Sequence, residues 1–151
     1  MANVLIPLCD AVVAELNANQ ASFSLPFTAA RMNVVRHNQQ DMSALLVTVT
    51  AKSRKSTPIT RAKSEYIIEI YVGIEKQMLT EANSESDPLI ALGEQLDDYW
   101  NNGKQPATFP GASCILTQFG EDGDSAWLSL RNQKEMLVYT GILKLVFKLV
   151  Q

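Results

Sequence analysis

Residue types that commonly perform catalysis are scarce in this sequence. The only histidine, His37, lies in the polar run RHNQQD, where no sequence neighbour would make it a general base. Asp97 and Asp98 are adjacent in an expected helix, so their side chains point about 100° apart rather than at one substrate atom. We therefore predict no catalytic site and do not expect an enzyme.

The remaining candidate ligands do not form a metal-binding pattern. Three acids lie in the run GEDGDS, residues 120 to 125: Glu121, Asp122 and Asp124. They lack the spacing and the terminal glutamate of a calcium loop, and we interpret them as a solvated turn. Cys9 and Cys114 lie far apart without a CxxC pattern, which predicts two buried thiols rather than a disulfide or metal pair. No metal or cofactor site is expected.

The most unusual stretch is AKSRKSTPITRAK, residues 51 to 63, which holds five cations and no acid. These cations are Lys52, Arg54, Lys55, Arg61 and Lys63. Lysine and arginine contact phosphates or acidic protein surfaces, whereas base stacking requires aromatic side chains, and none is interleaved here. The stretch is thus either a solvated loop or an arm that touches a phosphate backbone or an acidic neighbour.

The charges of the chain are segregated, although its net charge is only −3. Residues 31 to 63 carry seven cations and one acid, while residues 75 to 124 carry ten acids and two cations. The basic region could attract the acidic region of its own chain or the acidic region of a neighbouring copy. The candidate acidic counter-surface consists of Glu81, Glu85, Asp87, Glu94, Asp97 and Asp98.

Hydrophobic periodicity locates the elements that position these residues. Apolar residues at helical spacing predict a helix over 4–17, with Asn3 as a possible cap. Alternation predicts strands over 27–36, 45–50 and 65–78, the last being the clearest in the chain.

A second helix and three more strands are expected in the rest of the chain. Asp87 is the expected N-cap, Pro88 the first helical residue and Trp100 the last before a stop at NNG. Strands are expected over 114–119, 127–130 and 136–150. The order α-β-β-β-α-β-β-β predicts one α+β domain over 1–151, in which two amphipathic helices pack on a largely antiparallel sheet.

Two consequences follow for the surface. Residues 51–64 become a projecting basic hairpin arm with a long loop. Apolar side chains on the second face of the sheet need a cover, either the two helices or identical subunits. They are Ile67, Tyr71, Val138, Ile142, Val146 and Val150. No apolar run approaches the roughly 20 residues of a membrane span, and the first residues do not resemble a signal peptide.

The segments ITRAKSEYIIEIYVGIEKQ and DPLIALGEQL, together with this element order, resemble the tail-terminator and neck-connector proteins of tailed bacteriophages. The resemblance covers residues 4 to 150. It implies a structural virion protein, made in the bacterial cytoplasm, that forms a homo-oligomeric ring, commonly of six subunits, on the tail tube. Such a ring joins the tail to the neck or head connector, and DNA passes through its lumen.

On this resemblance, the arm 51–64 would face the lumen or an adjacent subunit, and we favour the subunit contact. Two alternatives remain. One is another head–tail connector or minor tail protein of the same fold. The other is a non-specific nucleic-acid-binding module that uses the basic arm, against which the pI of about 5.1 counts.

Overall fold

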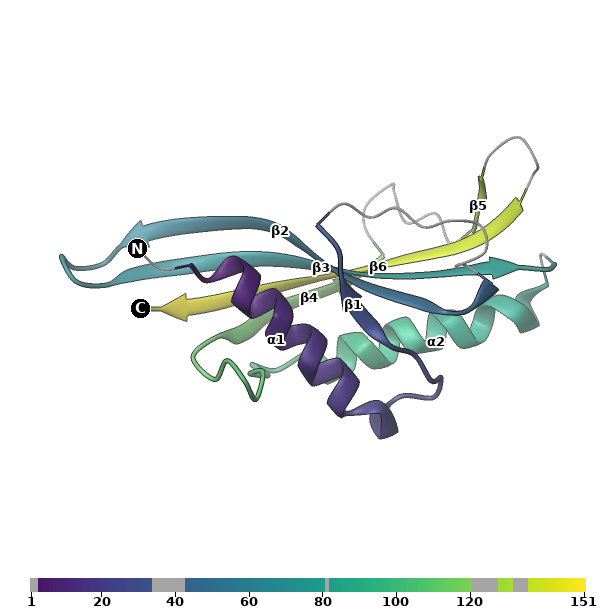
Figure 1. The fold of residues 1–151 in the computed structure, drawn as a ribbon, viewed down its shortest axis with the longest axis horizontal. Coiled ribbons are helices and arrows are strands. Elements are labelled where there is room, and N and C mark those ends of the chain that lie inside the picture. The colour runs from purple at the N-terminus through teal and green to yellow at the C-terminus, as the bar shows by residue number, and fades with distance from the viewer. Residues whose placement is uncertain (1–2, 34–42, 81, 121–127, 132–135) are drawn as a thin grey trace.

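A computed structural model describes residues 3–33, 43–80, 82–120, 128–131 and 136–151 (Figure 1). The predicted α+β fold and its order of elements are confirmed. The elements are α1 (Leu5–Ala18), a short 3₁₀ helix η1 (Gln20–Ser22), β1 (Ala29–Arg31), β2 (Leu46–Pro58), β3 (Ser64–Met78), α2 (Asn83–Trp100), β4 (Ser113–Phe119), β5 (Leu128–Arg131) and β6 (Met136–Val150).

The strands form one six-stranded sheet in the order β1-β2-β3-β6-β4, and β5 also pairs with β6. Only β1 runs parallel to its neighbour, β2, while the other described pairs are antiparallel. The strand expected over 27–36 is wrong in length, because β1 has only three residues. The side chain of Arg31, the last residue of β1, pairs with Asp10 on α1, with 2.7 Å between Nε and Oδ1. Residues 34–36 lie outside the described residues.

Both helices pack on the same face of the sheet. Buried residues of both helices belong to a single apolar cluster. The cluster also contains even-numbered residues of β3, such as Ile70 and Val72, and odd-numbered residues of β6, such as Leu145. Because side chains alternate across a strand, the odd-numbered residues of β3 point the other way. We call the face under the helices the covered face and the opposite one the distal face.

Both helices begin differently from the sequence-based expectation. Asn3 does not cap α1, whose N-cap is Val4 without a side-chain hydrogen bond. The second helix begins at Asn83 rather than Pro88, so Asp87 is not its N-cap. Pro88 is exposed on the solvent side of α2, where the carbonyl that loses its helical partner can bond to water instead.

One aromatic ring depends on two glycines. The ring of Phe119, at the end of β4, lies so close to Gly93 of α2 that a Cβ there would stand 2.1 Å from its Cζ atom. A Cβ on Gly141 of β6 would stand 3.2 Å from the same ring. The two glycines thus let α2, β4 and β6 approach one another around one side chain.

Candidate functional site

The basic arm is a strand rather than a loop through most of its length. β2 continues to Pro58 and pairs with β3 as far as Ser64, so only residues 59 to 63 form the turn. The expectation of a long loop is therefore wrong. The polar sequence has no apolar alternation, and its extended form is held by backbone pairing to β3, which is itself paired with β6. Figure 1 shows this hairpin at one end of the molecule.

Strand geometry distributes the five cations of the arm over different sides. The β2–β3 register skips Lys52 between Ala51 and Ser53, which marks a bulge. Lys52 and Lys55 consequently lie on the distal face, whereas Arg54 lies on the covered face, opposite Ile68. Arg61 and Lys63 belong to the turn. The five cations do not form one continuous basic face.

Two of the cations lie over aromatic rings supplied by β3. The Lys52 ammonium is 5.5 Å from the centre of the Tyr71 ring, and the Arg54 guanidinium is 5.1 Å from that of Tyr66. The linear sequence shows no aromatic among the cations because both rings come from the neighbouring strand. Cation–π contacts at exposed sites contribute about 0.5–1 kcal/mol each and limit the movement of the two side chains.

The tip of the arm has a defined turn. The N–H of Ile59 donates to the carbonyl of Lys63 at 3.0 Å, and the Thr60 hydroxyl accepts from the N–H groups of Ala62 and Lys63. Ile59 is 54% exposed there. The tip therefore presents one apolar side chain beside the charges of Arg61 and Lys63.

The distal face carries charged pairs between β3 and β6. The Lys144 Nζ atom lies 3.4 Å from Glu69 Oε1, and the Lys148 Nζ atom lies 3.3 Å from Glu65 Oε2. The Ser53 hydroxyl donates to Glu69 at 3.2 Å. In the described part of the chain no helix packs on this face. The expectation that the two helices bury the apolar side chains of the second face is therefore wrong.

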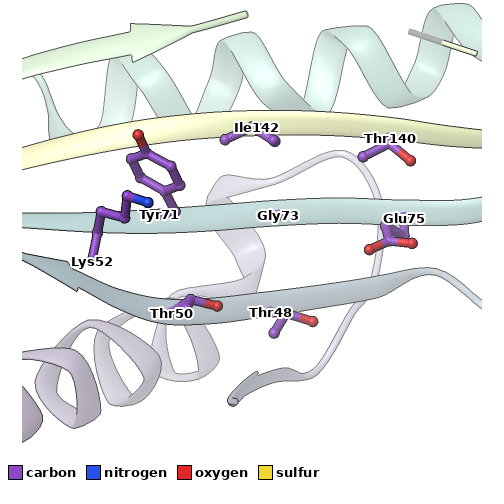
Figure 2. A pocket seen from close by; sticks show the side chains of 8 residues that line it. All are labelled: Thr48, Thr50, Lys52, Tyr71, Gly73, Glu75, Thr140 and Ile142. Carbon is purple, nitrogen blue, oxygen red and sulfur yellow. The ribbon is translucent and has the colours of Figure 1, made fainter. Parts of the chain in front are cut away.

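A hollow of about 370 Å³ opens on the distal face (Figure 2). Gly73 forms part of its floor, with Lys52 over Tyr71 at one end and the Glu75 carboxylate near Thr140 at the other. Its lining residues are Thr48, Thr50, Lys52, Tyr71, Gly73, Glu75, Thr140 and Ile142. This set offers hydroxyls and two opposite charges, but no pairing of a nucleophile with a histidine base.

Three of the described residues of the expected acidic counter-surface are exposed. Asp87, Glu94 and Asp98 are exposed and lie along the solvent side of α2; we call them the α2 acidic stripe. Glu85 instead accepts hydrogen bonds from the N–H groups of Leu79 and Thr80, and Asp97 has a carboxylate oxygen buried against the protein. Glu81 lies outside the described residues.

A buried carboxylate that the sequence pattern did not single out joins three segments. Glu15 on α1 is 7% exposed and accepts hydrogen bonds from the Tyr99 hydroxyl on α2 and from the N–H of Ala107 at 2.8 Å. Asn19 also donates to it, and the Lys104 ammonium lies 3.9 Å away. Burial raises the pKa of the carboxyl, but these bonds and Lys104 outweigh it and hold the pKa below the ordinary value of 4.5.

The burial of both thiols is confirmed. Cys9 and Cys114 are free and buried, and burial raises the pKa of each to about 11. Thiols with such pKa values stay protonated at neutral pH and are poor nucleophiles.

Within the described ranges, no group of three or more histidine, cysteine, aspartate or glutamate side chains is placed to hold a metal ion. The described helices include none long and apolar enough to cross a bilayer. His37, Glu121, Asp122 and Asp124 lie outside the described residues. No protein-family model and no curated protein matches this chain.

Proposed function

We propose that this protein is a structural assembly protein whose copies form a ring. In this ring, the basic arm of one copy packs against the α2 acidic stripe of the next. The observation that carries the proposal is the position of two oppositely charged surfaces on different parts of one chain. The arm lies at one end of the molecule, and α2 begins toward the other end (Figure 1).

Contacts between two different surfaces repeat from copy to copy. Such a heterologous contact produces a closed ring when its rotation closes, and a filament when it does not. A contact between identical surfaces would stop at two copies. The separation of arm and stripe therefore favours a ring over a simple dimer.

Among the residues that the structure describes, Lys55, Arg61 and Lys63 form no ion pair, and the same holds for the three acids of the stripe. Each isolated exposed ion pair contributes only about 0.2–1 kcal/mol. A ring contact built from several pairs would also bury Ile59, whose apolar side chain adds to the association.

The resemblance to phage tail terminators gives this proposal its biological form. We propose a ring, commonly of six copies, located in the virion at the head-proximal end of a tail, with the tail tube and a neck or connector protein as its partners. DNA would pass through the lumen with only transient contacts. A head–tail connector or minor tail protein of the same fold is the close alternative, with the same prediction of a ring.

Native mass spectrometry over a range of protein and salt concentrations tests the ring directly. Reversing the arm, with Lys55, Arg61 and Lys63 all changed to Glu, should abolish the closed oligomer. Reversing the stripe, with Asp87, Glu94 and Asp98 all changed to Lys, should do the same. Both sets of residues are exposed, so the variants should fold.

Mixing the two reversed variants provides the matched control. The acidic arm of one then meets the basic helix of the other, and the remaining surfaces also stay complementary, so an alternating ring should return. Failure of the mixture to assemble would contradict the proposed contact. A wild-type chain that stays monomeric under all conditions, including in the presence of tail tubes, would contradict the ring itself.

Binding of nucleic acid by the arm is the second candidate function. The stacking of Lys52 and Arg54 on tyrosines favours an ordered basic strand, but its cations lie on both sides of the sheet, where a single duplex cannot contact them all. Duplex binding that weakens steeply with salt and disappears in the arm-reversed variant would support it.

A further inference from the structure

A different surface lies at the opposite end of β3 from the arm, where the chain turns from Met78 toward α2. Leu79 is 85% exposed there, more than any other large hydrophobic side chain in the described part of the chain. A leucine side chain that stays in water contributes no burial energy to folding, and exposed apolar groups of this kind often belong to contact sites.

The turn that carries Leu79 is held in place by hydrogen bonds. The Glu85 carboxylate accepts the N–H groups of both Leu79 and Thr80, and the Thr80 hydroxyl accepts the N–H of Ala82 at 3.2 Å. A side chain on a backbone that is already fixed loses less conformational entropy on binding than one on a loose loop. Leu79 is thus a preorganised apolar knob.

An apolar hollow opens on the same surface. It has a volume of about 410 Å³, and its apolar wall consists of Leu25, Pro26, Leu45, Pro88 and Leu89. Lys76 and Glu85 line both this hollow and a smaller one to which Leu79 contributes. The knob and the larger hollow are therefore neighbours, with a cation and an anion between them.

We propose that two copies of this chain pair about a two-fold axis at this corner. The Leu79 side chain of each copy enters the apolar hollow of the other, and Lys76 of one copy faces Glu85 of the other. A two-fold contact uses the same patch on both copies, so the patch must contain its own complement. This surface meets that condition because it holds a knob, a hollow and both signs of charge.

The pairing does not rest on the proposed ring, since it uses neither the arm nor the α2 acidic stripe. If both contacts exist, the two-fold contact doubles the number of copies that the ring alone would hold. If only the corner contact exists, the protein is a dimer. The two contacts can therefore be tested separately in the same full-length chain.

Analytical ultracentrifugation over a range of protein concentrations measures the pairing. Leu79→Asp places a charge on the knob of each copy and should halve the mass of the assembly. The dissociation constant of the pair should rise roughly hundredfold. Leu79→Met keeps an apolar knob and should pair nearly as the wild type does. Lys76→Glu brings two acids together across each half of the contact and should also weaken pairing.

A matched surface control is Ile115→Asp. Ile115 is 52% exposed on β4 and lies outside the corner, so its loss should leave the two-fold pair unchanged. Thermal unfolding followed by circular dichroism should show that each variant folds, because the substituted side chains are exposed or half-exposed. An unchanged mass for Leu79→Asp at every concentration would overturn the pairing.

The arm-reversed variant separates this inference from the ring. With Leu79 intact it should still pair, giving two copies, whereas the variant that combines arm reversal with Leu79→Asp should be monomeric. An arm-reversed chain that is monomeric with Leu79 intact would also overturn the pairing, and so would a wild-type monomer at the highest concentration.

Discussion

The two faces of the sheet are made by the same strands and have opposite character. On β3, Ile70 and Val72 are fully buried beneath the helices, while Glu69 and Tyr71 between them point to the distal face. The covered face is an apolar core with one buried carboxylate, Glu15. The distal face holds charged pairs, threonines and a hollow with Lys52 and Glu75 among its lining residues.

This difference separates stability from recognition. Burial on the covered face supplies most of the folding free energy, because each fully buried aliphatic side chain contributes about 1.5–3 kcal/mol. Half-exposed side chains on the distal face contribute much less to folding and remain available for contacts. Substitutions on matched positions of the two faces should therefore have very different effects.

The largest expected difference is between two isoleucines on β3. Ile70→Ala removes buried methyl groups from the core and should lower the free energy of unfolding by about 2–5 kcal/mol. Ile67→Ala, on the half-exposed distal face, should lower it by about 1 kcal/mol or less. Urea unfolding monitored by circular dichroism measures both. Equal losses would contradict the assignment of the covered face.

The buried carboxylate of Glu15 should contribute strongly at neutral pH. Glu15→Gln removes the charge that Tyr99, Ala107 and Lys104 stabilise, and should cost about 1–3 kcal/mol at pH 7. Since the folded-state pKa is lowered, the contribution is present above the ordinary pKa of 4.5 and is lost as pH falls through the folded value.

Unfolding curves from pH 7 down to pH 3 measure this dependence. The wild type should lose more stability than Glu15→Gln over that interval. Glu69→Gln is the control on the distal face, where the carboxylate is partly exposed and pairs with one lysine. A Glu15→Gln variant with the same acid sensitivity as the wild type would show that the hydrogen bonds do not stabilise the charged form.

Close packing on the covered face should make Gly93 sensitive to one added methyl group. Alanine has the better helix propensity by about 1 kcal/mol, but its Cβ would overlap the Phe119 ring. Gly93→Ala should therefore be destabilising overall, by about 1–3 kcal/mol. Adding Phe119→Leu should recover part of the loss. A Gly93→Ala variant more stable than the wild type would mean that the ring moves aside without cost.

The smallest effect is expected from the charged pairs of the distal face. Lys148→Ala removes the contact with Glu65 and should cost about 0.2–1 kcal/mol, with the difference from wild type vanishing in 1 M salt, where screening is strong. Lys55→Ala, which removes an exposed cation from the arm, is the control and should change stability less. A loss above about 2 kcal/mol for Lys148→Ala would indicate a buried pair.

The elements with strong periodicity could be predicted from sequence. The alternation over 65–78 identified β3 because one face of a strand must be apolar to join a core. The apolar stripes of α1 and α2 were visible for the same reason. The start of α2 was missed because its first residues, Asn83 to Asp87, are polar and carry no apolar stripe.

The candidate surfaces could be predicted only in part. Separation of basic and acidic segments is a property of the sequence, and so is the burial tendency of the two cysteines. How far each charge is exposed depends on the fold, because Glu85 accepts backbone hydrogen bonds and one Asp97 carboxylate oxygen is buried, whereas Asp98 is exposed. The aromatic rings beneath Lys52 and Arg54 come from another strand and leave no local signal.

The sequence by itself determined the class of the fold, the order of its elements and the charge of each region, since these follow from local periodicity and composition. Tertiary structure alone decided that both helices cover one face, that the arm is a strand, and that Glu15 is buried. The physical reason is that each of these depends on a partner distant in the chain: pairing with β3 makes the arm extended, and bonds from Tyr99 and Ala107 make burial of the Glu15 charge tolerable.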